Sequence, residues 1–526
     1  MKKENNKRQE TILSTKQTPQ TKLPVPDDKS ILVYSLGGVG QIGMNWTLYG
    51  HKGQWILVDA GTAFPPRDMK MINAIFPDNS MLKEIIPKLR GLVVTHAHED
   101  HIGAIHRLWP KINCPIYATP FARKALEARF EERNTDRLVK IVQFGVGGKF
   151  KVGPFDIETA GVTHSAPECV ALSLDTNIGT VFHTGDWKFD PDPVIGKPTD
   201  MERIKKIGTK NVLAMVCDST NSLRKGKITS EASVYTGFKK VFEDSKGLVV
   251  VSCFATNVAR VASIMKAASA ANREVAISGR SLVRYEKIAR ELGMLKGIPE
   301  PLRFASHLKG LDRRNMTLIC TGTQAEENAA LSRLSRGDDW KLPDIQPGDV
   351  VVHSARVIPG NESDVYAMFD ALRAKGAKIL EAEYKGLPLH VTGHATSGEI
   401  SQMYDMVKPR FSIPVHGNPE HLEAHSKIAL NAGVEDVVTP SEGSVFSVSE
   451  QGISKIAQIP MKLQAELDDR AHTRIPWDEA KARATIETLS NPKKNNNAEK
   501  NGNRNSRHRT PKKNHVHAAP AAMGTP

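Results

Sequence analysis

His96-Ala97-His98-Glu99-Asp100-His101 follows directly on an apolar run and places three imidazoles and an aspartate within six residues. In an extended segment, residues two apart point to the same side, so His96 and His98 can hold one cation. Asp100 and His101 fall where the chain turns into an apolar-periodic stretch, so they project differently and suit a second cation. The alternative is a loop with surface or core histidines, and the density of ligand-type side chains argues against it. The hexapeptide predicts a two-metal site.

Two cations need more ligands than this stretch supplies. Three residues elsewhere end short apolar, strand-like runs, namely His164, Asp186 and His416. Ligands gathered at strand ends are the usual way in which a site is built on a rigid sheet. An aspartate can bridge two cations through its two oxygens, and Asp186 is the predicted bridge.

Residues 38–43 match the G-x-G-x-x-G pattern of dinucleotide-binding folds, and Asp59 lies about 20 residues further on. That fold requires a helix next. Strand formers at 44–49, a turn at 50–53 and an apolar run at 55–58 predict a β-hairpin instead. The glycines are therefore expected to form a tight turn near the metal site, and Asp59 to orient a ligand histidine or a water.

The ordered set of Asp59, the hexapeptide, His164 and Asp186 resembles the metallo-β-lactamase superfamily. Most members reach their last metal-binding histidine soon after the bridging aspartate, whereas His416 follows Asp186 by 416 − 186 = 230 residues, so a domain is inserted. The insertion resembles the β-CASP branch, with residues 216–220 as its acidic motif and His394 and His416 as the next two. Within that branch the chain resembles ribonuclease J, supported by residues 36–45, 320–324 and 358–362.

This resemblance implies an α/β fold, an αββα metallo-β-lactamase sandwich interrupted by a β-CASP domain with a parallel sheet. Strands at 247–251 and 274–278 alternating with helices at 258–271 and 282–292 also predict that sheet. The expected parts are a disordered basic arm (1–30), the sandwich (31–223 and 379–460), the β-CASP domain (224–378), a short helical remnant (461–490) and a disordered basic tail (491–526). The remnant stands where relatives carry a small domain that helps dimer formation, so a dimer stays open.

Two zinc ions are the expected cofactors, with manganese as the alternative at the more oxygen-rich site. His96, His98, His164 and Asp186 are assigned to one site, and Asp100, His101, Asp186 and His416 to the other. Asp59, Asp100, Asp186 and His394 are the predicted catalytic residues, with His394 on the scissile phosphate. For His390, a structural hydrogen bond and substrate contact are both open.

Substrate contacts are expected from the inserted domain and from the segment that returns to the sandwich. Ala255, Thr256 and Asn257 resemble a family stretch that binds RNA at a strand-to-helix turn, where helix amides favour phosphate. A pocket for a 5′ monophosphate is predicted from Arg280, Ser281, Ser354 and Arg356, because arginine offers paired donors to phosphate oxygens. Surface salt bridges are the alternative for Arg280 and Arg356. The remaining expected contacts are Val391, Thr392 and Gly393.

The net charge of +14 is concentrated at the ends, since residues 1–30 contribute 7 − 4 = 3 and residues 491–517 contribute 8 − 1 = 7. Such arms attract polyanions through counterion release, and a solubilising extension is the alternative. Five cysteines without a C-x-x-C pair indicate buried thiols in a reducing compartment. No signal-peptide core or membrane span is expected. We therefore expect a cytoplasmic enzyme with RNA as its partner.

The resemblance implies a two-metal ribonuclease that degrades RNA 5′→3′ from monophosphorylated ends, with endonucleolytic cuts in addition, in mRNA decay and rRNA maturation. Three alternatives stay open at this point. They are a β-CASP DNA nuclease, a hydrolase of small lactones or thioesters, and an RNA-binding scaffold with an inactive site.

Overall fold

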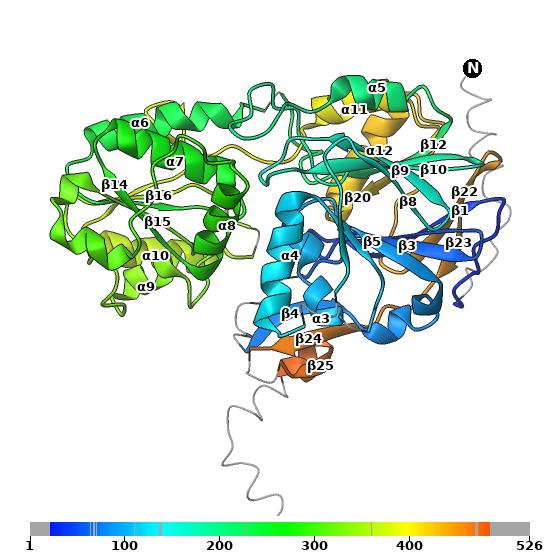
Figure 1. Cartoon of the computed structure of the whole chain (residues 1–526), viewed down its shortest axis with the longest axis horizontal. Helices are drawn as coiled ribbons and strands as arrows, with labels where there is room; N and C mark the ends of the chain where they lie inside the picture. The colour runs from blue at the N-terminus through cyan, green and yellow to red at the C-terminus, as the bar shows by residue number, and fades with distance from the viewer. Residues whose placement is uncertain are drawn as a thin grey trace, which may run out of the picture.

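The computed structural model describes residues 21–483, apart from 64, 67, 68, 70, 110, 136–138, 227, 359 and 469–471. Residues 1–20 of the predicted arm (1–30) and the whole predicted tail (491–526) lie outside the described residues. Figure 1 shows two lobes, a sandwich built from both ends of the described chain and an α/β domain drawn in green. Across the described ranges, no helix is both long and apolar enough to cross a membrane.

The first sheet of the sandwich has the strand order β23-β22-β1-β2-β3-β5-β6-β7. Its β2 and β3 pair as an antiparallel hairpin, so the expected hairpin is confirmed and the dinucleotide fold is excluded. Strands β22 and β23 come from the C-terminal part of the described chain. β22 pairs with β1, and β23 pairs with β22. The strands are β1 (Ile31–Gly37), β2 (Trp46–His51), β3 (Gln54–Val58), β5 (Leu89–Val93), β6 (Ile116–Ala118), β7 (Ile141–Gln143), β22 (Ser444–Ser449) and β23 (Gly452–Gln458).

The second sheet has the order β21-β20-β12-β11-β10-β9-β8. Here β12 runs parallel to both β11 and β20, so the carboxyl ends of three strands meet at one edge. Buried residues of the two sheets, such as Val33, Leu172 and Val216, form one core between them. The strands are β8 (Lys149–Val152), β9 (Phe155–Gly161), β10 (Val170–Thr176), β11 (Gly179–His183), β12 (Val212–Asp218), β20 (Phe411–Val415) and β21 (Asp436–Val437).

Helices cover the outer faces of both sheets, as the predicted αββα sandwich requires. Apolar side chains of α3 (Ile105–Leu108) and α4 (Pro120–Glu132) pack on the first sheet. The second sheet is covered by α5 (Met201–Ile207), α11 (Ser397–Val407) and α12 (Pro419–Asn431). The sandwich therefore has four layers, in the order helices, sheet, sheet, helices, with the main core between the two sheets.

The inserted domain has a five-stranded parallel sheet in the order β14-β15-β13-β16-β17, which confirms the predicted parallel sheet. Helices α6, α7 and α8 pack on one face, and α9 and α10 on the other. The elements are α6 (Val234–Asp244), β13 (Val249–Ser252), α7 (Val258–Ala270), β14 (Glu274–Ser278), α8 (Arg280–Glu291), β15 (Met316–Cys320), α9 (Ala330–Arg336), β16 (Val350–His353), α10 (Glu362–Ala374) and β17 (Lys378–Leu380).

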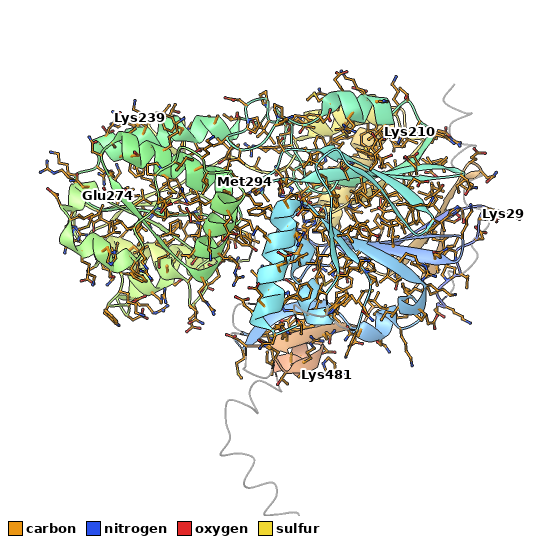
Figure 2. The ribbon with its side chains drawn as sticks, in the orientation of Figure 1. Lys29, Lys210, Lys239, Glu274, Met294 and Lys481 are labelled. Atoms are coloured by element: carbon orange, nitrogen blue, oxygen red, sulfur yellow. The ribbon has the colours of Figure 1, made fainter. Side chains whose placement is uncertain are left out.

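Helix α8 faces α4 of the sandwich across the junction of the two lobes (Figure 1). Met294, just after α8, packs against the same apolar cluster as α4 and lies on the side of its domain that faces the sandwich (Figure 2). The two lobes therefore share buried apolar contacts at this junction.

The prediction of a short helical remnant over 461–490 is wrong for the segment that carries β24 (Leu463–Leu467) and β25 (Arg474–Trp477). These strands form a three-stranded sheet with β4 (Ile72–Pro77). Gln464 and Glu466 are polar residue types that would be expected on the exposed face of a helix, but both are buried. The Gln464 amide donates to the Pro77 carbonyl, and Glu466 accepts from the Arg107 guanidinium. Strand pairing with β4 and this polar burial override the local pattern.

Candidate metal centre

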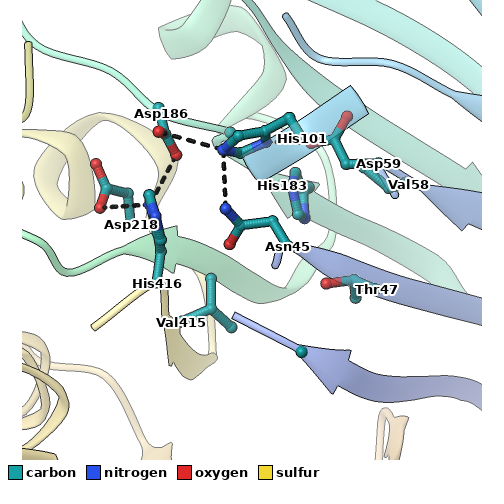
Figure 3. A pocket seen from close by; sticks show the side chains of 12 residues that line it. Asn45, Thr47, Val58, Asp59, His101, His183, Asp186, Asp218, Val415 and His416 are labelled. Atoms are coloured by element: carbon teal, nitrogen blue, oxygen red, sulfur yellow. Dashed lines mark hydrogen bonds and ion pairs between the residues drawn. The ribbon is translucent and has the colours of Figure 1, made fainter. Parts of the chain in front are cut away.

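The predicted ligands converge at the edge of the two sheets where the parallel strands end. His96 and His98 follow β5, and Asp100 and His101 lie on the short helix α2 (Glu99–Ile102). The other ligands follow strands of the second sheet, with His164 after β9, Asp186 after β11 and His416 after β20. Figure 3 shows Asp186 between His101 and His416, beside Asp218 from the end of β12.

The first cluster contains His96, His98, His164 and Asp186, with ligand atoms within 4.8 Å of one another. His164 Nε2 lies 3.1 Å from His98 Nδ1 and 3.6 Å from Asp186 Oδ2. His164 Nδ1 donates to the Gly393 carbonyl at 2.7 Å, which leaves its Nε2 lone pair for a cation. His96 Nε2 is buried without a hydrogen-bond partner. A cation bound here would satisfy that orphaned atom, so these residues fit a metal ion.

The second cluster contains Asp100, His101, Asp186 and His416. His101 Nε2 lies 3.3 Å from Asp186 Oδ2, and His416 Nε2 lies 3.3 Å from Asp100 Oδ2. His416 Nε2 is also buried without a hydrogen-bond partner. Because Asp186 belongs to both clusters, it is placed to bridge two ions.

Electrostatics distinguish the two clusters. Burial lowers the pKa of His96 and His164 well below the usual value and that of His98 to about 4, so these imidazoles keep free lone pairs. Burial also opposes protonation of His101 and His416, but neighbouring carboxylates, Asp186 first among them, raise the pKa of both well above the usual value. A divalent cation would displace these protons and balance the same carboxylates.

Asp59 supports the second cluster from behind. Its Oδ2 accepts from His101 Nδ1 at 2.7 Å and from the Thr95 hydroxyl at 2.7 Å, and its Oδ1 accepts from the Thr95 amide at 2.8 Å. With Nδ1 donating to Asp59, His101 presents Nε2 to the cluster, as predicted for a carboxylate that orients a ligand. Asn45 Nδ2 lies 2.9 Å from His101 Nε2 and donates to Asp100 at 3.3 Å.

The backbone around the centre is unusual for its residue types. Asp59 and His416 have φ values of 58° and 55°, in the left-handed region that non-glycine residues seldom adopt. Gly38 has a φ of 71° and its carbonyl accepts a hydrogen bond from the His416 amide. The glycine-rich stretch is therefore a turn against a metal-ligand segment, as predicted. At Gly61, an added Cβ would lie 1.7 Å from the Asp100 carbonyl oxygen.

Asp218 belongs to the acidic motif noted in the sequence, but no site role was predicted for it. Its Oδ2 lies 2.8 Å from His394 Nδ1, and the two residues form a third cluster with Asp186 and His416. Burial opposes protonation of His394, yet Asp218 raises its pKa above the usual value. The signal in the sequence was that Asp218 ends a buried strand, as the other ligands do.

Several predicted substrate contacts instead surround Arg260, which is completely buried. Its Nη1 donates to the Ser354 hydroxyl at 2.6 Å and lies 3.3 Å from His390 Nδ1, and its Nη2 donates to the Val391 carbonyl. Glu231 pairs with the same guanidinium at 2.6 Å. For His390 the structure supports the structural hydrogen bond. Ser354 and Val391 also contribute these polar groups to an internal network.

The remaining predicted contacts differ in exposure. Thr256 and Asn257 are buried, Ala255 is half-buried, and the Asn257 side chain caps α7 by accepting from the Arg260 amide. Thr392 Oγ1 accepts from Asn221, and Gly393 holds His164.

Arg280, which begins α8 just after β14, and Arg356, just after β16, are exposed, and the structure gives neither an acidic partner within its described ranges. Ser281 is half-buried and follows Arg280 on α8. Because β14 and β16 are parallel members of one sheet, these residues lie at the same edge.

Family models cover most of this architecture. Residues 54–202 match the β-lactamase superfamily domain, residues 246–372 the ribonuclease J β-CASP domain, and residues 388–440 the Zn-dependent metallo-hydrolase RNA specificity domain. The match at 246–372 agrees with the inserted parallel-sheet domain, and the match at 388–440 contains His394 and His416.

Curated relatives agree. The chain is 39% identical over 439 residues to ribonuclease J of Sinorhizobium meliloti, covering 82% of this chain and 77% of the relative. It is 38% identical to ribonuclease J of Mycolicibacterium smegmatis (78% and 73% covered) and 34% identical to that of Helicobacter pylori strain 26695 (84% and 64%).

A solved structure shares the fold. It is a protein of unknown function from Enterococcus faecalis V583, which matches with a TM-score of 0.56 at 14% identity, over 80% of this chain and 100% of that one. Taken with the two histidine–aspartate clusters, the family models and curated relatives show a metal-dependent nuclease of the hydrolase class. This chain belongs to the ribonuclease J family.

Proposed function

We propose that this chain is a two-zinc ribonuclease that degrades RNA 5′→3′ from monophosphorylated ends and takes part in mRNA decay and rRNA maturation. The observation that carries the proposal is the pair of ligand clusters sharing Asp186 beside the Asp218–His394 pair. Manganese is the alternative ion for the second cluster, which has two carboxylates against one in the first. The five cysteines are free and buried, which supports a reducing compartment such as the cytoplasm.

The side chains divide the work of hydrolysis among them. Two bound cations would lower the pKa of water and neutralise charge on the phosphate. Asp186 and the six other predicted ligands would hold that pair, and Asp59 accepts from His101 Nδ1, which fixes the tautomer of His101. The Asp218 carboxylate accepts from His394 Nδ1, so Nε2 is the nitrogen left for the substrate.

Burial opposes protonation of His394, but the Asp218 carboxylate raises its pKa above the usual value, which favours the protonated imidazole that can donate a proton to the leaving oxygen. Attack by water on phosphorus breaks the bond to O3′, and the proton from His394 completes the 3′ hydroxyl. The attacked phosphate stays on the 5′ oxygen of the shortened RNA, which is again 5′-monophosphorylated, and the released nucleotide carries the original terminal 5′ phosphate.

The preference for a 5′ monophosphate rests on the edge of the β-CASP sheet. Arg280 and Arg356 are exposed at the carboxyl ends of two parallel strands, without an acidic partner in the described structure. A terminal phosphate carries more charge than an internal one, and a guanidinium can bind two of its oxygens. RNA as the substrate is supported by the names of the relatives and of the RNA specificity domain.

The test uses one RNA, labelled at its 3′ end and carrying a 5′ monophosphate or a 5′ triphosphate. Full-length protein is assayed with zinc or with manganese, beside a His98→Ala variant and a matched DNA. We expect processive loss of the monophosphorylated RNA, slower loss of the triphosphate form and no activity in the variant. Equal internal cleavage of both RNAs would remove end recognition. Cleavage of DNA alone, or of lactones alone, would replace the proposal with one of the alternatives.

A further inference from the structure

Glu99 stands between the two groups of metal ligands in the hexapeptide, but arginines hold its carboxylate. Arg129 Nη1 donates to Glu99 Oε1 at 3.1 Å and Arg129 Nη2 donates to Oε2. Arg107 Nη1 donates to Oε1 at 3.3 Å. Glu99 therefore ties the helix that carries Asp100 and His101 to α4, the helix of Arg129.

Arg129 continues the connection into the other domain. Its Nη2 also donates to the Tyr285 hydroxyl at 3.1 Å, and Tyr285 lies on α8 of the β-CASP domain. The Tyr285 side chain is buried and its ring stacks on Phe121 of α4, with centroids 5.8 Å apart. A continuous polar path thus runs from α8 to the metal-ligand helix (α4 and α8 face each other in Figure 1).

Few other partners are available to this guanidinium. Arg129 Nε is buried without a hydrogen-bond partner, so Glu99 and Tyr285 are the side chains that satisfy Arg129 among the residues described. A buried charged donor that loses an acceptor pays a large desolvation cost unless it moves. Loss of the Tyr285 hydroxyl would therefore shift Arg129, and Glu99 with it.

The helix that would move is short. α2 has four residues and no side-chain cap at its N-terminus. On the metal side, the Asn45 amide donates to the Asp100 carbonyl at 2.8 Å and the Ala60 amide to the His101 carbonyl at 2.7 Å. On the other side, the Glu99 carboxylate is the side-chain contact of α2, so it is one of the groups that position Asp100 and His101.

We propose that an interdomain relay is formed by Glu99, Arg129 and Tyr285. Through this relay, the packing of the β-CASP domain against the sandwich sets the geometry of the second metal site. The three are positioning residues, since none touches the reacting atoms. The relay rests on the two-metal site proposed above. The relay makes retention of the second ion depend on the contact between α8 and α4. A nuclease in which this contact is lost would therefore bind its second ion weakly.

The test compares Tyr285→Phe and Arg129→Lys with Lys124→Gln in the full chain loaded with metal. Lys124 is the matched control because its 2.8 Å ion pair with Glu291 joins the same two helices at an exposed position. Retention of the second ion is measured by competition with a chelator. The values of kcat and KM are measured with monophosphorylated RNA. We expect Tyr285→Phe and Arg129→Lys to weaken retention and lower kcat about five- to tenfold, as the loss of one hydrogen bond to a charged group would. Their KM should stay unchanged and Lys124→Gln should match the wild type.

A double variant separates a relay from local effects. Tyr285 and Glu99 have no direct hydrogen bond in the structure, since Arg129 lies between them. If the relay operates, the loss of retention in Tyr285→Phe/Glu99→Gln is smaller than the product of the two single losses, whereas independent sites multiply. Wild-type retention in Tyr285→Phe, or losses that multiply, would overturn the relay. Chelator competition needs no RNA, so a wild-type protein that holds two ions but cleaves no RNA would refute only the proposed function.

Discussion

Replacing Asp59 by asparagine tests the second metal site through a buried residue whose carboxylate accepts a hydrogen bond from His101. Three donors face the Asp59 carboxylate, namely the amide and hydroxyl of Thr95 and Nδ1 of His101. An amide offers one oxygen and one NH2 group, so at least one donor loses its acceptor. If the NH2 group faces His101, the imidazole proton must move to Nε2, the atom that would bind the metal.

The magnitude follows from this geometry. Removing a partner that orients a metal-bound histidine costs about 10- to 100-fold in metal affinity or activity. That range corresponds to about 1.4–2.8 kcal/mol, close to the value of one hydrogen bond to a buried charged group. We therefore expect Asp59→Asn to lower second-ion affinity by about 10- to 100-fold, with a similar loss of kcat.

The assay is chelator competition followed by cleavage of monophosphorylated RNA at saturating and at limiting zinc. Asp156→Asn serves as the control, because Asp156 is 68% exposed in an ion pair on the same sandwich. Asp59→Asn should recover part of its activity at high zinc, while the control behaves as wild type. Unchanged affinity and kcat in Asp59→Asn would refute the reasoning, since the next polar neighbour of His101 Nδ1, Thr95 Oγ1, is 3.5 Å away.

Three further outcomes are expected. His394→Gln should keep both metals but lose about 10²- to 10⁴-fold in single-turnover rate, as a proton donor would, and a full rate would contradict this role. Burial lowers the pKa of His425 to about 4, below its unfolded value of about 6.5, so stability present at pH 7 is lost as the pH falls through this window. Urea unfolding should show about 2 kcal/mol less stability from this group at pH 5, and His425→Gln should remove that loss. Glu466→Gln should cost about 3–5 kcal/mol in the same assay because Glu466 is a fully buried partner of Arg107, whereas Glu435→Gln, in an exposed pair, should cost under about 1 kcal/mol.

The convergence of the predicted ligand side chains could be expected from the sequence, because several of them follow a buried apolar strand. The hydrophobic run before His96 and the similar runs before Asp186 and His416 mark strand ends, where side chains of a parallel sheet converge. The hairpin after the glycines was equally visible, since strand formers replaced the helix that a dinucleotide fold needs. Local pattern and tertiary structure agree at these places.

The buried polar network around Arg260 could not be predicted. The members of this network are far apart in the chain and are polar or charged types that are usually exposed. They are Glu231, Arg260, Ser354 and His390. Their burial depends on pairing that exists only once the inserted domain has folded. The strands β24 and β25 were missed for the same reason, because the edge of β4 and the arginines that neutralise Glu466 are contributed by distant segments.

The position of His416 on β20 has a consequence for synthesis of the chain. All four ligands of the first cluster have been made once residue 186 is reached, but the second cluster waits for a histidine 416 − 186 = 230 residues later. At about 5–20 residues per second, translation needs about 10–50 s to cover that interval, during which the β-CASP domain can fold as a unit. In the two-ion enzyme proposed above, a ribosome-bound chain could therefore complete only the first ion site in this period. The emerging enzyme would then stay inactive toward the messenger that encodes it until nearly all of its fold has been assembled.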